Sequence, residues 1–238
     1  MAKAVERYES DGTTAAEAVY DEGAVADGSS TAARRIWCKN ASTSAEDLIG
    51  CIAGIDPVGE NDGNDLVLIA PDVPFAAPGQ PTAAASAGAG LEVGDYLYAI
   101  TFLSANGETT QGTTRAVSTT GGNQRVSLSA IPTGPTGVTK RRIYRTEVGG
   151  SDLYMVAELA NNSATTYVDS TPDSSLSDPP PTLNASGIPG AWADDDITLG
   201  TLAVDAFAAC CMRYTVPAGT SQIGNPRRAY VTFEETGA

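Results

Sequence analysis

The stretch Tyr96-Leu97-Tyr98-Ala99-Ile100-Thr101-Phe102-Leu103 decides the fold class of the residues around it. Successive side chains of a β-strand point to opposite faces, so every second residue of this stretch falls on one apolar face. This alternation predicts a half-buried β-strand. The pair Asn106-Gly107 follows it and accepts the positive φ of a tight hairpin turn, so we expect the chain to reverse there.

Further β-like segments follow at intervals typical of a sandwich. They cover residues 124–131, 141–147 and 153–159, with turn signals at Pro132-Thr133-Gly134-Pro135 and Gly149-Gly150. Short strands separated by turns favour a β-sandwich over a sheet crossed by helices. We therefore predict an all-β fold.

Four segments of this region carry a resemblance to a known class of modules. They read Gly94-Asp95-Tyr96-Leu97-Tyr98-Ala99-Ile100-Thr101-Phe102, Asn106-Gly107-Glu108-Thr109, Arg142-Ile143-Tyr144-Arg145-Thr146 and Thr166-Tyr167-Val168-Asp169-Ser170. In this order they resemble the fibronectin-III and immunoglobulin-like modules of tailed-phage virion proteins. Residues 212–220 and 224–233, with Val-Pro-Ala-Gly and Gly-Asn, are similar to closing segments of phage structural domains. The resemblance implies a structural role in the head, collar, tail or baseplate.

Proline- and glycine-rich segments divide the chain. Residues 71–90 read as a linker, and 178–181 with 185–190 read as a second break. The flanks hold strand-like pieces that are too few on each side to fold separately: 35–39, 47–53, 65–70, 206–216 and 228–233. We predict an outer β domain built from residues 1–81 and 182–238, with an immunoglobulin- or fibronectin-III-like sandwich inserted at 82–181.

Residues 1–33 lack a convincing periodicity. Residues 13–20 suit one or two helical turns, but Gly12, Gly23 and Gly28 interrupt the pattern. Two readings remain open for this segment. It is either an extended arm that orders on a neighbouring subunit or a surface segment of the outer domain.

The net charge of −15 lies mainly on the flanks. Residues 82–181 hold 6 of the 14 basic and 9 of the 29 acidic side chains, which leaves −12 for the rest. An acidic surface repels phosphate backbones, so we expect no nucleic-acid partner. No apolar run reaches the ~18 residues of a membrane span, and the amino terminus lacks a signal-peptide core. We expect synthesis and assembly in the host cytoplasm and a final location in the virion.

The sequence offers few candidate catalytic residues. The chain contains no histidine, which removes the Ser-His-Asp and Cys-His mechanisms. Asp194-Asp195-Asp196 is the densest carboxylate cluster, but adjacent residues do not form an acid/base pair. Residues 59–65 offer oxygen ligands for calcium, although a turn at Asp62-Gly63 explains the same residues. We expect no enzyme activity, no cofactor and no metal.

Two residues of the sandwich have a functional and a structural interpretation. Tyr144, between Arg142 and Arg145, could stack on a nucleic-acid base, or it could face the core with the arginines on the wet face and on turns. Asp169 could supply a ligand oxygen, or it could end the last strand and accept hydrogen bonds from turn amides. The structural interpretation is favoured for both.

The four cysteines, Cys38, Cys51, Cys210 and Cys211, all lie in the outer domain. Their spacing is not that of a zinc site. Buried thiols are the first expectation for a cytosolic product. Cys210 and Cys211 are adjacent in a predicted strand, so one would face outward and could form a disulfide within or between subunits in the mature particle.

These observations lead to one expectation and one alternative. We expect a non-enzymatic virion protein that decorates the head, forms a neck or collar, or accompanies the tail, with copies of itself and other virion proteins as partners. The alternative is a carbohydrate-binding module that holds the particle to glycans of a host surface. Its site would need exposed aromatic residues, and the candidates are Tyr154, Tyr167 and Trp192.

Overall fold

The chain folds into β-strands arranged in two compact units. The structure is a computed structural model that describes residues 5–8, 20–23, 29–30, 34–40, 48–57, 66–192, 197–203, 205–215 and 227–235. These residues form four sheets, and their helical content is one 3₁₀ turn at Asp173–Ser175. The first unit comprises Met1–Val73 and Pro189–Ala238, and the second comprises Pro74–Ile188. The all-β prediction is confirmed.

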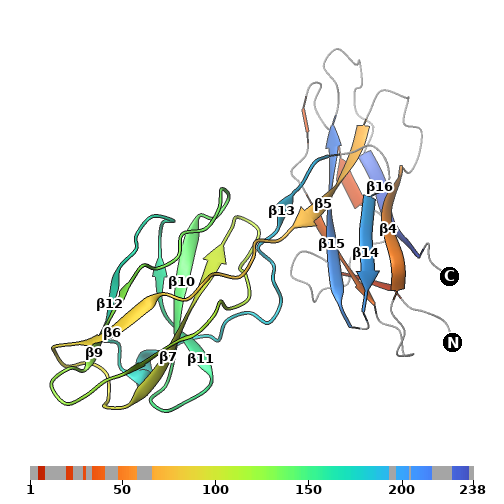
Figure 1. The fold of residues 1–238 in the computed structure, drawn as a ribbon. Helices are drawn as coiled ribbons and strands as arrows, with labels where there is room; N and C mark the ends of the chain where they lie inside the picture. Colours follow the sequence, from red (N-terminus) through yellow and green to blue (C-terminus); the bar gives the residue numbers. More distant parts are fainter. Residues whose placement is uncertain are drawn as a thin grey trace. The chain divides into compact units, whose positions relative to one another are not determined.

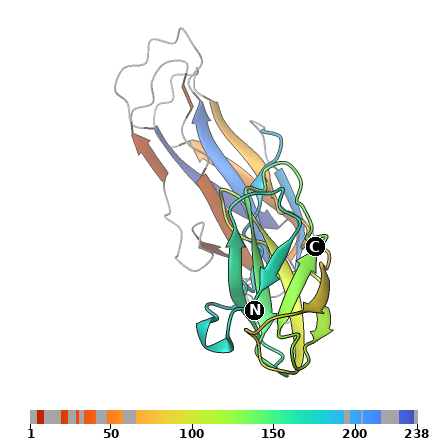
Figure 2. The ribbon, with the colours of Figure 1, turned by 90° about the vertical axis from the view of Figure 1, so that its left-hand side faces the viewer.

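The first unit, which we call the outer domain, contains two sheets. The five-stranded sheet has the order β1 (Val5–Tyr8), β3 (Arg34–Asn40), β15 (Phe207–Thr215), β5 (Leu66–Val73) and β13 (Ile188–Pro189). The four-stranded sheet has the order β14 (Ile197–Leu202), β4 (Leu48–Pro57), β16 (Arg227–Glu235) and β2 (Tyr20–Gly23). Strands from the two ends of the chain, red to orange and blue, lie side by side in both views (Figure 1, Figure 2).

The interleaving follows from where the apolar residues lie. In the five-stranded sheet, Cys210 lies opposite Ile36 of β3, and Met212 lies opposite Ile69 of β5. All four side chains are buried. The core face of β15 therefore requires an upstream strand on each side, and neither flank can complete the sheet alone. The prediction that both termini build the outer domain is confirmed.

The described parts of residues 1–33 belong to these sheets. Strand β1 pairs with β3, and β2 pairs with β16. The sequence predicted no strand at either position. A helical turn at 13–20 lies almost wholly outside the described residues, and its last residue, Tyr20, begins β2.

The second unit, which we call the inserted sandwich, consists of a four-stranded and a three-stranded sheet. The four-stranded sheet has the order β11 (Leu153–Leu159), β10 (Lys140–Thr146), β7 (Asp95–Leu103) and β8 (Arg115–Ser118). The three-stranded sheet has the order β12 (Tyr167–Asp169), β9 (Arg125–Ser129) and β6 (Thr82–Ser86). Tyr98, Ile100, Val126, Leu128 and Ile143 form the centre of the core between them.

Seven strands in two antiparallel sheets is the architecture of immunoglobulin-like domains, but the last strand is placed differently. In the immunoglobulin order the last strand joins the sheet of its predecessor. Here β12 leaves β11 and pairs with β9 in the other sheet. The residues after β12 return to β11, where Met155 N–H donates to Asp178 O and Ser177 N–H donates to Met155 O.

Strand β7 is more deeply buried than the alternation predicted. Tyr96, Tyr98 and Ile100 face the core between the sheets, as expected. Ala99 on the opposite face is also fully buried, because it packs with Tyr144 and Leu153. The expectation of a half-buried strand is therefore wrong: both faces of β7 are covered.

The predicted reversal at Asn106-Gly107 is confirmed. Ser104 N–H donates to Gly107 O at 2.8 Å, and Leu103 forms an isolated bridge with Glu108. Gly107 has a φ of 155°, and a Cβ at this position would lie 2.5 Å from Ala185 O. Glycine is required here by both the backbone conformation and the close approach of the neighbouring segment.

The sandwich extends beyond residues 82–181 at both ends. Phe75 packs with Phe102 and Val138, and its main-chain atoms bond to Asn184 and Ser186. Residues that read as linkers in the sequence therefore belong to the packed unit Pro74–Ile188. Proline and small residues indicated irregular backbone correctly, but Phe75, Pro78 and Pro81 within it are buried.

Candidate functional site

A buried charged network joins strands of both sheets of the sandwich. Arg145, which is fully buried, donates from Nη1 to Asp169 Oδ2 at 2.8 Å and from Nη2 to Asp173 Oδ1 at 2.6 Å. The hydroxyl of Tyr98 also donates to Asp169 Oδ2, at 2.7 Å. Burial, and then the charge of Asp169, raises the pKa of the Tyr98 phenol, so it remains a donor.

This network corrects one prediction and supports another. Arg145 does not lie on the wet face, because its guanidinium points between the sheets and lies 5.1 Å from the ring centre of Tyr96. Asp169 Oδ1 accepts a hydrogen bond from Thr171 N–H at 2.8 Å, which is the predicted role of a strand-ending carboxylate. Its second oxygen is held by Tyr98 and Arg145, so both oxygens serve the fold.

A second buried arginine closes loops rather than pairing with an acid. Arg141 donates to the main-chain carbonyls of Pro132 at 2.9 Å, Ala164 at 2.5 Å and Asn161 at 3.2 Å. Burial lowers the pKa of this guanidinium. The side chain fixes the loops that precede β10 and follow β11.

A third network covers the outward face of the four-stranded sheet. Glu108 accepts hydrogen bonds from Thr101 Oγ1 at 2.5 Å, Tyr144 OH at 2.7 Å and Arg142 Nη1 at 2.6 Å. Burial, and then the bond to Glu108, raises the pKa of Tyr144. Tyr144 is buried, so its ring does not present the exposed stacking face that a base would need. It packs with Ala99 and Leu153 on the outward face, so the expectation that it faces the core between the sheets is wrong.

Three cysteines lie in the five-stranded sheet of the outer domain, Cys38 in β3 and Cys210 with Cys211 in β15, and all three are buried. Cys210 and Cys38 share the core face, while Cys211 lies on the opposite face beside the Arg35–Asp72 ion pair. Cys211 is only 2% exposed, so the expectation that one thiol of the pair faces outward is wrong. Cys210 and Cys211 are free thiols. The side chain of Cys51 lies outside the described residues, and a disulfide in a mature particle stays a prediction.

Burial also makes these thiols poor nucleophiles. It raises the pKa of Cys211 to about 11, with a further contribution from the charge of Asp72. Burial likewise raises the pKa of Cys210. The thiolate is the reactive form, so both groups are inert near neutral pH.

The aromatic candidates for a glycan site lie on separate elements. Tyr154 lies in β11 and Tyr167 in β12, which are edge strands of different sheets, so the two rings do not share one sheet face. Trp192 belongs to the outer domain, where the guanidinium of Arg213 lies 4.3 Å from its ring centre.

Other predicted features cannot be placed. Asp194-Asp195-Asp196 and most of the loop 59–65 lie outside the described residues. Within the described ranges, no group of three His, Cys, Asp or Glu side chains is arranged to hold a metal ion. No helix of the described chain is long and apolar enough to cross a membrane.

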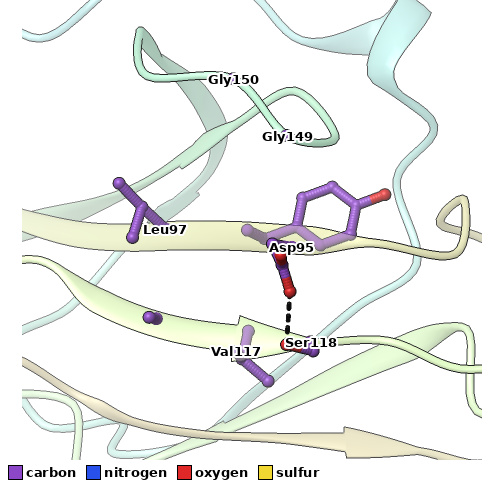
Figure 3. A pocket seen from close by; sticks show the side chains of 8 residues that line it. Asp95, Leu97, Val117, Ser118, Gly149 and Gly150 are labelled. Atoms are coloured by element: carbon purple, nitrogen blue, oxygen red, sulfur yellow. Dashed lines mark hydrogen bonds between the residues drawn. The ribbon is translucent and has the colours of Figure 1, made fainter.

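A pocket that the sequence did not predict lies at one end of the four-stranded sheet. Its volume is about 380 Å³, and it opens between β7, β8 and the turn at Gly149-Gly150. Figure 3 shows the Asp95 carboxylate beside Ser118, and the hydroxyl of Ser118 donates to Asp95 Oδ1 at 2.5 Å. Leu97 and Ala116 lie opposite each other on the face of Asp95 and supply apolar surface. The Gly-Gly pair indicated a turn, but no sequence signal places that turn beside β7.

Comparisons with known proteins leave the family of the chain open. No protein-family model matches the sequence, and no curated protein is significantly similar to it.

Proposed function

We propose that this protein is a non-enzymatic structural component of a tailed-phage virion. It decorates the head, contributes to the neck or collar, or accompanies the tail, and it is present in many copies. The outer domain makes the contacts with other copies and with other virion proteins. The inserted sandwich projects from the particle.

The observation that carries this proposal is the way in which the sandwich is inserted. In the outer domain, Gly190 N–H donates to Pro71 O at 2.9 Å, so the departing and returning chain segments are neighbours. In the sandwich, Asn184 Nδ2 donates to Phe75 O at 2.8 Å, so the two segments are neighbours there as well. A module that enters and leaves by adjacent segments can be displayed without interrupting the sheet that anchors it.

The use of the charged groups also supports a structural role. In the sandwich, Arg145, Arg141 and Glu108 each hold separate strands or loops together. Their geometry is that of cross-links inside the fold. Many copies of one such subunit would convert modest contacts into stable attachment to a particle.

The test is whether the protein is part of the particle. Phage particles encoded by the same genome would be banded in a density gradient and probed with antibodies against the inserted sandwich. We expect the protein to remain with the particles after a high-salt wash, and the antibodies to label intact particles at regular positions. Protein that stays in the soluble lysate fraction would contradict the proposal.

The glycan alternative gives a different result in the same material. A host-surface adhesin would bind glycans as the purified chain, and a Tyr154→Ala change would remove that binding. Particle association without glycan binding supports the structural role alone. If the protein is absent from particles and binds glycans, the glycan-binding function is supported and the structural role is contradicted.

A further inference from the structure

The pocket beside Gly149-Gly150 lies at the start of β7. The chain connections contact the other end, where Phe75 packs on Phe102 near the close of β7. Asp95 is the first of the nine residues of β7, so the strand separates the pocket from the connections by roughly 27 Å. A surface at this end is not occupied by the segments that tie the sandwich to the chain.

The pocket contains one carboxylate that is only partly engaged. Asp95 Oδ1 accepts the hydroxyl of Ser118, and no hydrogen bond or ion pair reaches Oδ2 from the described residues. Elsewhere in the sandwich the carboxylates of Glu108, Glu158, Asp169 and Asp173 each pair with a basic side chain. Asp95 has no basic partner within the described chain, and it is the carboxylate that lines this cavity.

We propose that this pocket binds a lysine side chain presented by a protein partner. The ammonium group would lie at Asp95 Oδ2, and the methylene stem would pack on Leu97 and Ala116, which share the face of Asp95, as long basic side chains do on apolar surface. The volume of about 380 Å³ is large enough for the stem and ammonium of one lysine side chain.

A lysine ammonium fits the carboxylate oxygen that has no partner within the described chain. A guanidinium binds a carboxylate best through two parallel hydrogen bonds, one to each oxygen. Ser118 already donates to Oδ1 of Asp95, so a guanidinium would share that oxygen with the hydroxyl, whereas an ammonium needs only Oδ2. The comparison of lysine with arginine is therefore part of the test.

The surrounding charge attracts the same kind of partner. Glu92 precedes Asp95, and Glu147 and Asp152 flank the glycine turn; all three are exposed and have no ion pair within the described chain. Their field would steer a basic segment toward the pocket. They supply attraction at a distance, whereas Asp95 supplies the contact.

The test is an NMR titration of the full chain with small probes. The probe is Nα-acetyl-lysine amide, with the arginine and norleucine amides as the bidentate and uncharged comparisons. We expect saturable shifts at the amides of Asp95, Ser118, Gly149 and Gly150, with the lysine probe bound more tightly than either comparison. Asp95→Asn should weaken binding about fivefold, which is the scale of an exposed ion pair. Asp152→Asn makes the same chemical change outside the pocket lining and should leave binding nearly unchanged.

Three results would overturn the proposal. These are the absence of saturable shifts at the pocket, equal binding of the norleucine probe, and equal weakening by Asp95→Asn and Asp152→Asn. The spectrum of each variant reports whether the sandwich is folded, so a folding failure is separated from a loss of binding. The proposal does not rest on the virion assignment, and particle association would stand if the titration failed.

Discussion

The inserted sandwich and the outer domain differ in how far apart in sequence their paired strands lie. In the sandwich, β7 pairs with β8, the next strand in sequence, and β10 pairs with β11. In the outer domain, β15 pairs with β3, so Phe207 lies opposite Lys39. The sandwich is thus encoded by one continuous segment, whereas the outer domain depends on residues from both ends of the chain.

The two regions both bury charged groups, but they use them over different distances in the chain. The sandwich buries Arg141 and Arg145, whose hydrogen-bond partners all lie between residues 131 and 173. The outer domain buries the Arg35–Asp72 ion pair, and the core face of its five-stranded sheet carries Ile36, Cys210 and Met212. The comparison teaches that polar cross-links and apolar packing occur in both units, and that only in the outer domain does the core join segments from the two ends of the chain.

The largest expected effect comes from a substitution that unfolds the outer domain and leaves the sandwich folded. Met212→Asp places a charge at a fully buried position opposite Ile69, and an unpaired buried charge costs several kcal/mol or more. We expect calorimetry to show loss of the outer-domain transition with the sandwich transition unchanged. Thr198→Asp, at an exposed position of β14, is the matched control and should change neither transition. A loss of both transitions in Met212→Asp would show that the units fold together.

The next largest effect comes from a substitution that destabilises the sandwich and leaves the outer domain unchanged. Arg145→Ala leaves Asp169 buried without its cationic partner, and breaking a buried pair in this way costs about 3–5 kcal/mol. Chemical denaturation should show this loss in the sandwich transition. Lys140→Ala removes a pair whose lysine is 48% exposed and should cost no more than about 1 kcal/mol. Equal losses in the two variants would contradict a structural role for the buried network.

The stability of the outer domain should depend on pH through the buried thiol of Cys211. The pKa of Cys211 is about 11 in the folded protein and near the ordinary 9.0 when unfolded, so folding favours the protonated thiol. Its stabilisation is complete below pH 9 and is lost as the pH rises from about 9 to about 11, at a cost of about 2–3 kcal/mol. Denaturation in reducing buffer should show a steeper loss in the native chain than in Cys211→Ala. Identical slopes would show that this thiol is not buried.

The smallest effect concerns one turn of the sandwich. Gly107→Ala places a Cβ 2.5 Å from Ala185 O at a φ of 155°, and we expect a loss of about 1 kcal/mol or more. Gly121→Ala is the control, because nothing lies within 4 Å of its Cβ position. Denaturation of the two variants measures the difference. A neutral Gly107→Ala would mean that the segment at Ala185 does not pack against the hairpin.

The sequence predicted strands where the pattern is local. The strand β7, the turn at Asn106-Gly107 and the strands β9 to β11 follow from neighbouring residues, and all are present. Six short strands were missed, because two to six residues without a strong apolar pattern become strands only through their partners. They are β1, β2, β6, β8, β13 and β14.

The candidate site was less predictable than the fold. The burial of Arg145 depends on Asp169 and Asp173, which lie 24 and 28 residues away, and no local pattern indicates such pairing. The pocket at Asp95 likewise depends on a turn more than fifty residues further along the chain. The ends of the sandwich were placed too narrowly because proline-rich segments read as linkers, whereas Phe75 and Ser186 are packed.

Hydrogen exchange on the chain truncated after Ile188 tests the central claim most directly. This truncation removes β14, β15 and β16 but leaves the whole unit Pro74–Ile188. We predict that the amides of β7, β9 and β10 remain as protected as in the full chain, while those of β3 and β5 exchange freely. Protection retained in β3 and β5, or lost in β7 and β10, would contradict an independent sandwich carried by a domain that needs both ends of the chain.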